Sequence, residues 1–242
     1  VTPNVMHFHI IKNFLEANFN VVTDKPMTYN LDEAHQLKDI VEKSGNVFAV
    51  TYNYTGYPVV RQAKHMVETG QLGKIQKVIC EFPQDWLITR LEAEGVKQAM
   101  WRTDPKQAGA GGALGDICSH AENMINYVTG LEIDEMCADL TIFAEGRELD
   151  DDCNILVHYN GGAHGILHAS QISTGYENGL NFRIFGTEGG LQWVQENPNY
   201  LVYSKPGEPK QILSRSNGYL CDAATRCTRL PAGHPEAFHE AF

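Results

Sequence analysis

Asp116 and His120 are residues whose types and spacing fit proton transfer. They lie four positions apart at the start of an expected helix over 117–129, and residues at this spacing share a helix face, with Cβ atoms about 5–6 Å apart. A carboxylate near an imidazole raises its basicity and fixes its orientation, which suits removal of a proton from a substrate hydroxyl. In a plainer interpretation, Asp116 only caps the helix and His120 is a partly buried histidine. The spacing alone favours this plainer interpretation.

Lys25 is a second candidate because of its place after a strand. The preceding run, residues 19–23, is expected to be a buried parallel strand, and open α/β sheets bind ligands at the carboxyl ends of their strands. Lys25 also precedes Pro26, and an X-Pro peptide bond can be cis, which changes the direction of the preceding side chain. The alternative is an exposed lysine in a turn, and position alone does not decide between the two.

Three histidines, His158, His164 and His168, invite a metal-binding interpretation. On a strand, however, His164 and His168 would lie roughly 13 Å apart, given a rise of about 3.3 Å per residue. One ion cannot bridge that distance, so we expect histidines on the face of a sheet and no metal site.

The first 52 residues show the alternating elements of a parallel α/β sheet. Thr2 and Pro3 suit the start of a helix, whose expected apolar stripe contains Met6, Ile10, Phe14 and Ala17, with Ile11 and Leu15 beside them. The expected elements are a helix up to about residue 17, a strand over 19–23, a helix over 30–44 with a capping box of Asn30 and Glu33, and a strand over 47–50. Because such a sheet domain does not open on a helix, we expect the chain to be a fragment.

The pattern changes after residue 52 to helices at 58–69 and 117–129 and a series of strands. The expected strands are 74–82, 137–144, 152–159, 163–173, 180–186, 190–195 and 199–204, with Asn160-Gly161-Gly162 as a hairpin turn. We therefore expect an α/β protein: a partial Rossmann-type domain over 1–52, then an α+β domain over 53–242 with a large, mostly antiparallel, open-faced sheet. The stretch 83–112 is expected to be irregular, and the segment 214–231 cannot be assigned.

Composition limits the partners of the chain. Nineteen basic and 30 acidic residues give a net charge of −11, which disfavours nucleic acid and anionic membranes, because both need a basic face. No apolar run reaches the roughly 18–20 residues of a transmembrane helix. The six cysteines are dispersed without a C-x-x-C pair, which indicates reduced thiols and a cytoplasmic protein.

Eight short motifs, taken in order, resemble one known family. They are VTPNVMH (1–7), DKP (24–26), YNY (52–54), GQLGKI (70–75), WR (101–102), GGALGDICSH (111–120), GTEGGLQW (186–193) and GHPEAFHEAF (233–242). Together they identify the chain as similar to the Gfo/Idh/MocA family of NAD(P)-dependent sugar and polyol oxidoreductases. The resemblance covers essentially the whole chain and implies NAD or NADP as cofactor, with a glycine-rich strand–helix unit expected before Val1.

The resemblance also implies roles for individual residues. Lys25, Asp116 and His120 would be catalytic: His120 as the acid/base on the oxidised hydroxyl, Lys25 as a donor to that oxygen, and Asp116 as the group that orients His120 or the substrate. Asp24 stands where the family has Glu. The residues expected along the cofactor and its cleft are Thr2, Pro3, Asn4, His7, Asp24, Lys25, Asn53, Trp101 and Arg102.

The function expected from the resemblance is hydride transfer between NAD(P) and a hydroxyl carbon of a sugar or polyol. Two alternatives are a non-catalytic cofactor-binding or regulatory relative and an inactive, truncated assembly domain. Alternating strands such as 155–159 and 165–169 place apolar side chains on both sheet faces, and too few helices remain to cover both. We therefore expect a homodimer or homotetramer formed through the open sheet face. The alternative is a solvated face of Thr, Ser, Gln and His, which the sequence partly permits.

Overall fold

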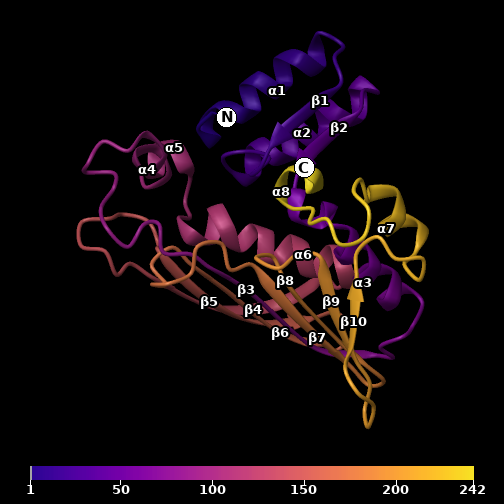
Figure 1. Cartoon of the computed structure of the whole chain (residues 1–242). Coiled ribbons are helices and arrows are strands. Elements are labelled where there is room, and N and C mark those ends of the chain that lie inside the picture. The colour runs from indigo at the N-terminus through magenta and orange to yellow at the C-terminus, as the bar shows by residue number, and fades with distance from the viewer. Residues whose placement is uncertain (1) are drawn as a thin grey trace.

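The computed structural model describes residues 2–242 and contains two sheets of very different size. A small parallel α/β unit at the N-terminus lies above a large sheet and its covering helices (Figure 1). In the small unit, a 3-10 turn (η1, Asn4–Met6) leads into α1 (His7–Glu16), followed by β1 (Val21–Asp24), α2 (Leu31–Ser44) and β2 (Phe48–Thr51). Strands β1 and β2 pair in parallel, with Asp24 opposite Thr51. The expected parallel α/β arrangement is confirmed.

The start of α1 differs from the sequence prediction. Pro3 occupies the position before η1, and no side chain caps it, so Thr2 is not the N-cap. Met6 and Phe14, from the expected apolar stripe, are exposed. The buried stripe is Phe8, Ile11 and Leu15, which pack with Leu37 of α2; Ile11 and Leu15 belong to the expected stripe, whereas Phe8 does not. Apolar residues lie on two adjacent faces of this helix. The periodicity of the sequence alone does not show which of the two faces packs against α2.

Helix α2 begins and ends as its residue types dictate. The Asn30 side chain accepts a hydrogen bond from the Glu33 backbone N–H at 2.9 Å, and Gly45 adopts a left-handed conformation with φ 67°. The Glu33 carboxylate accepts from the Tyr29 N–H, not from that of Asn30. The expected capping box is therefore only half formed.

The large sheet has eight strands in the order β10-β9-β8-β7-β3-β6-β5-β4. Their bounds are β3 (Ile75–Pro83), β4 (Ile133–Thr141), β5 (Asp152–Tyr159), β6 (His164–Ser170), β7 (Asn181–Gly186), β8 (Gly190–Val194), β9 (Tyr200–Ser204) and β10 (Gln211–Ser214). Neighbouring strands are antiparallel except for β3 and β6. The expected large, mostly antiparallel sheet is confirmed, whereas β10 was not foreseen. Gly161 and Gly162, both at φ 87°, form the expected turn between β5 and β6.

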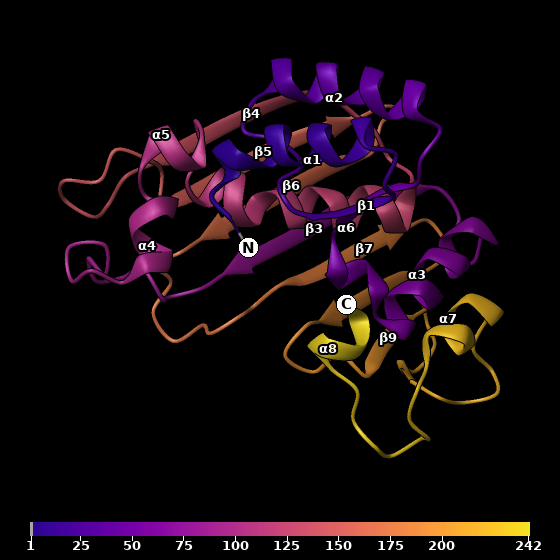
Figure 2. The ribbon, with the colours of Figure 1, turned by 90° about the horizontal axis from the view of Figure 1, so that it is seen from above.

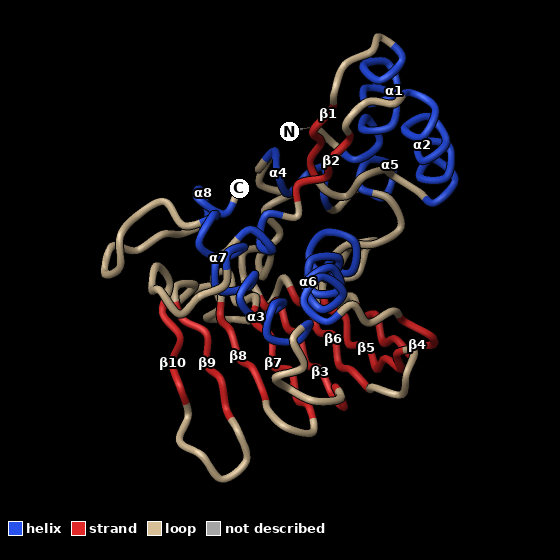
Figure 3. Tube along the Cα trace, turned by 90° about the vertical axis from the view of Figure 1, so that its right-hand side faces the viewer, coloured by secondary structure: helices blue, strands red, loops and turns tan. Residues whose placement is uncertain are grey.

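Helices cover one face of this sheet (Figure 3). Helix α6 (Ser119–Thr129) crosses the middle strands, with α3 (Pro58–Glu68) beside it (Figure 2). Their fully buried apolar side chains pack on Val78, Cys80 and Phe82 of β3 and exclude water from the core. The remaining short elements are η2 (Asn53–Gly56), α4 (Lys97–Arg102), α5 (Pro105–Ala108), a π-helical turn η3 (Leu114–Cys118), α7 (Asp222–Cys227) and α8 (Phe238–Ala241). Two of them, α4 and α5, lie in the stretch 83–112 that was expected to be irregular.

The opposite face of the large sheet is open and carries exposed apolar side chains. Phe185, Leu156 and Ile212 are 43%, 60% and 64% exposed. The structure therefore has apolar side chains on both faces of the sheet, as the alternating strands of the sequence predict. Among residues 2–242, no helix combines the length and the apolar character needed to cross a bilayer.

Candidate active site

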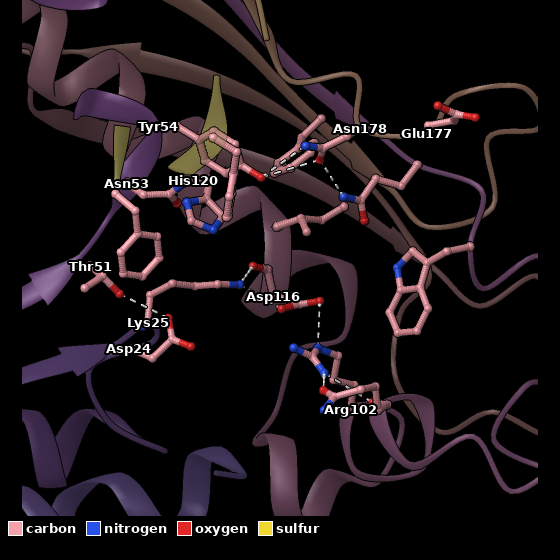
Figure 4. Close-up of a pocket in the computed structure, with 17 residues that line it drawn as sticks. Asp24, Lys25, Thr51, Asn53, Tyr54, Arg102, Asp116, His120, Glu177 and Asn178 are labelled. Carbon is pink, nitrogen blue, oxygen red and sulfur yellow. Dashed lines mark hydrogen bonds and ion pairs between the residues drawn. The ribbon is translucent and has the colours of Figure 1, made fainter. Parts of the chain in front are cut away.

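Lys25, from the end of β1, reaches across to Asp116 in the turn that precedes α6 (Figure 4). The Lys25 Nζ atom lies 2.7 Å from Asp116 Oδ1 and also donates to the Asp116 carbonyl oxygen. The Lys25–Pro26 peptide bond is cis. The structure thus joins two of the predicted catalytic residues across the two sheets of the molecule.

Asp116 is surrounded by donors. Gln171 donates to Asp116 Oδ2 at 3.0 Å, and Arg102 Nε lies 3.4 Å from the same oxygen. Burial alone would raise the pKa of the Asp116 carboxyl, but the Lys25 and Arg102 charges outweigh it and hold this pKa below its ordinary value. Asp116 is therefore an anion that anchors cations, not a proton acceptor.

His120 is 6% exposed and lies one helical turn after Asp116. Its ring makes edge-to-face contacts with three aromatic rings, at centroid distances of 4.8–5.9 Å: those of Tyr52, Tyr54 and Phe82. Burial, and secondarily the Lys25 charge, lower the pKa of His120 to about 3, although the Asp116 charge acts in the opposite direction. The imidazole is therefore neutral near pH 7 and has a lone pair free to accept a proton.

These side chains border a cavity of about 490 Å³, within the range of small-molecule sites. Its lining residues are Asp24, Lys25, Thr51, Asn53, Tyr54, Phe82, Gln84, Trp86, Gln98, Arg102, Asp116, Ile117, His120, Glu177, Asn178, Phe238 and Phe242. Asn53 is 8% exposed, and its Nδ2 atom has no hydrogen-bond partner among residues 2–242. A buried amide with a free donor is costly unless a ligand satisfies it, so the cavity is suited to a polar ligand.

The other predicted cofactor residues lie in different places. Asp24 borders the cavity, where its carboxylate accepts hydrogen bonds from the Lys25 N–H and the Thr51 hydroxyl. Trp101 does not line the cavity, contrary to expectation: its ring packs under the Arg102 guanidinium at 4.2 Å. This cation–π contact with Trp101 stabilises the position of the Arg102 guanidinium.

The N-terminal residues Thr2, Pro3, Asn4 and His7 also lie outside the cavity lining. His7 Nδ1 donates to the Pro26 carbonyl oxygen at 2.7 Å, and Asn4 Nδ2 donates to the Ala108 carbonyl oxygen at 2.8 Å. These two bonds hold the segment that carries Lys25 and the segment at Ala108, which precedes the glycines at 109, 111 and 112. The expected contact of these N-terminal residues with a cofactor stays a prediction.

Sequence reasoning missed Gln171, which is 3% exposed and donates to Asp116. It follows β6, whose parallel neighbour is β3. A glutamine after an apolar strand was the only signal in the sequence, and it could not show which carboxylate the side chain meets. Among residues 2–242, no group of three or more His, Cys, Asp or Glu side chains is arranged to hold a metal ion.

Comparison with known protein families agrees with this architecture. Residues 60–192 match a family model described as the GFO/IDH/MocA C-terminal domain, and residues 1–52 match one described as an oxidoreductase family with an NAD-binding Rossmann fold. The chain belongs to the Gfo/Idh/MocA oxidoreductase family. The family resemblance of the eight sequence motifs is thereby confirmed.

Several members of the Gfo/Idh/MocA family are similar over most or all of this chain. The uncharacterized oxidoreductase YfiI of Bacillus subtilis is 34% identical, over 100% of this chain and 62% of its own length. Levoglucosan dehydrogenase of Pseudarthrobacter phenanthrenivorans is 28% identical, over 83% of this chain and 55% of its own. The crystal structure of an inositol dehydrogenase homolog from Azotobacter vinelandii, complexed with NAD+, has a TM-score of 0.95 and 35% identity, with 100% and 62% coverage. The chain therefore spans less than two thirds of the length of these relatives.

Proposed function

We propose that the whole protein oxidises a hydroxyl group of a sugar or polyol with NAD(P). The observation that carries this proposal is the convergence of Lys25, anionic Asp116 and neutral His120 on one polar cavity. Oxidation of an alcohol needs a group that polarises its oxygen and a base that takes its proton. This cavity holds one of each, on elements that are far apart in the sequence.

The residues of the cavity fit a nicotinamide and a hydroxylated substrate. Asn53 has an unpartnered buried donor, and Asp24 and Lys25 lie at the carboxyl end of a parallel strand, the edge at which open α/β sheets bind their ligands. When bound, the nicotinamide would accept the hydride from the substrate carbon. Asn53 and the end of β1 would hold it beside Lys25.

Lys25 would polarise the hydroxyl oxygen. Its ammonium has three donors, of which one meets the Asp116 carboxylate and another the Asp116 carbonyl oxygen. The third remains for a substrate oxygen, where the positive charge lowers the pKa of the hydroxyl. Asp116 holds this ammonium in place, because both of its bonds to Lys25 come from a single residue.

His120 would take the proton from the hydroxyl oxygen onto an imidazole nitrogen. Its pKa of about 3 keeps the ring neutral before the reaction, and the burial that lowers this pKa also makes the ring a weaker base than a free imidazole. The surrounding Tyr52, Tyr54 and Phe82 rings exclude water from most of its surface, which strengthens the electrostatic influence of Asp116 and Lys25 on it. In the reverse direction the same ring would return the proton.

The substrate class is supported by the relatives. One solved neighbour is complexed with NADH and myo-inositol, and another, levoglucosan dehydrogenase, with NADH and levoglucosan. Both ligands are hydroxylated rings without charge. The mixture of amide, carboxylate and aromatic residues in this cavity can contact the hydroxyl groups and the C–H faces of such a ring.

The test is turnover by the purified whole protein. We expect reduction of NAD+ or NADP+ with at least one member of a panel of inositols, aldoses and levoglucosan, followed by the absorbance of the reduced nicotinamide. Isothermal titration with each dinucleotide provides the second measurement. Dinucleotide binding without turnover of any panel member would contradict the proposal and favour a non-catalytic, cofactor-binding relative.

A further inference from the structure

We infer that Asp150 is a positioning residue for Asp116 and His120; this inference rests on the proposed function. Asp150 lies in the connection between β4 and β5 and is 8% exposed. It does not line the cavity. Its carboxylate faces the turn that starts the helix carrying both site residues, and it binds that turn through hydrogen bonds.

Three consecutive backbone N–H groups of this turn donate to Asp150. The Gly112 N–H donates to Oδ1 and the Leu114 N–H to Oδ2, both at 2.7 Å, and the Ala113 N–H donates to the Asp150 carbonyl oxygen at 2.8 Å. The first N–H groups of a helix have no partner within the helix. A carboxylate on two of them both satisfies these donors and complements the positive end of the helix dipole.

This contact sets the position of the site because the helix continues without a break. The Asp116 N–H donates to the Gly112 carbonyl oxygen at 2.9 Å, η3 runs directly into α6, and His120 follows one turn later. A Cβ atom on Gly112 would collide with the Asp150 carbonyl oxygen. The two backbones therefore lie in direct contact, and a shift of residues 112–114 would move both site residues.

Asp151 offers a matched control next in the chain. It is 1% exposed, and its carboxylate likewise accepts from two backbone N–H groups, those of Phe143 and Ala144, at 2.8 and 2.9 Å. It also pairs with Arg147 at 3.3 Å. These contacts hold the β4–β5 connection itself. Loss of either carboxylate should cost stability, whereas only loss of Asp150 should disturb the site.

The experiment compares D150A, D150N and D151N in the whole protein. For D150A we expect kcat to fall by about 10- to 100-fold, the scale of a misplaced catalytic group, with KM changed less than about threefold, because Asp150 does not line the cavity. D150N keeps one acceptor oxygen and should recover part of kcat, but should remain at least about fivefold below the unaltered protein. D151N should keep kcat within about twofold.

A second measurement does not depend on activity. Diethyl pyrocarbonate modifies accessible, neutral imidazoles, and peptide mass mapping gives the rate at each histidine. We expect the rate at His120 to rise several-fold in D150A and to stay unchanged in D151N, with exposed His35 as the internal standard. A His120 rate and a kcat that respond equally to D150N and D151N overturn the inference. If the protein turns over no sugar or polyol, the labelling rates at His120 still test the positioning role of Asp150. If D150A does not fold, the comparison of D150N with D151N tests it.

Discussion

At the scale of single residues, the site depends on charge that is held in fixed places. Asp116 is an anion held by Lys25, Arg102 and Gln171, and His120 is kept neutral by burial and by the Lys25 cation. Since Lys25 and His120 both adjoin the cavity, a hydroxyl group that binds there meets a cation and a neutral base together. Two predictions follow from the state of His120.

Replacement of His120 by alanine should remove the proton acceptor. We expect kcat of the whole protein to fall by two to four orders of magnitude, the usual contribution of general acid–base catalysis, with dinucleotide affinity little changed. His35→Ala, on the exposed side of α2, is the control and should retain activity within about twofold. Near-normal turnover by His120→Ala would remove His120 from the catalytic role.

The neutral state of His120 should also make the fold sensitive to acid. Its folded pKa of about 3 lies below the ordinary 6.5, so between these values the unfolded chain binds one more proton than the folded chain. The free energy of unfolding should therefore fall by about 1.4 kcal/mol for each pH unit below 6.5. Urea unfolding at a series of pH values measures this slope, and His120→Gln should flatten it, whereas His35→Gln should not. Equal slopes in both variants would show that His120 titrates normally.

At the scale of elements, the turn that starts the site helix is packed too closely for a side chain at Gly112. An added Cβ atom would meet the Asp150 carbonyl oxygen, whereas one at Gly115 would meet nothing within 4 Å. Both glycines lie in the same motif of the sequence, so only the packing distinguishes them.

Gly112→Ala should therefore destabilise the protein by about 1–3 kcal/mol, the usual cost of overpacking. Gly115→Ala should be neutral or stabilise it by up to about 1 kcal/mol, because alanine favours helical conformations. Urea unfolding of the two variants side by side measures the difference. Equal stability of the two variants would contradict the packing described for Gly112.

Elements with local signals were predicted well, and those that depend on distant contacts were not. Asn30 and Gly45 delimit α2, Pro58 begins α3, and the Asn160 turn joins β5 to β6, because capping and turn chemistry act within a few residues. The buried face of α1, the short strand β10, and the partners Gln171 and Asp150 depend on segments far away in the chain. The approach of Lys25 to Asp116 was expected only through the family resemblance, since 91 positions separate them.

At the scale of the whole molecule, the open sheet face predicts assembly. Phe185, Leu156 and Ile212 are exposed apolar side chains of this face, and an exposed apolar surface on a soluble protein commonly marks an interface when it is large. A second copy of the chain, packed face to face, would cover them. Such a face-to-face pair would be a two-fold symmetric dimer, the commonest form of soluble oligomer.

Light scattering at micromolar concentration should therefore give a mass of at least twice the 27.0 kDa of this chain. Leu156→Lys, which places a charge in the open face, should shift the mass toward the monomer. His35→Lys, on exposed α2, should leave the mass of the assembly unchanged. A monomer mass for the unaltered chain would refute the assembly.

The central position of β3 has a consequence for the time course of folding. This strand pairs with β6 on one side and β7 on the other. Lys77 can therefore form its strand pairing only after its partners His164 and Phe185 have been synthesised. At a synthesis rate of about 5–20 residues per second, the roughly 100 residues between them take about 5–20 s to emerge from the ribosome. During that interval Val78, Cys80 and Phe82, later fully buried, lack their partner strands. Nascent chains halted before β6 should therefore be the species most readily captured by chaperones.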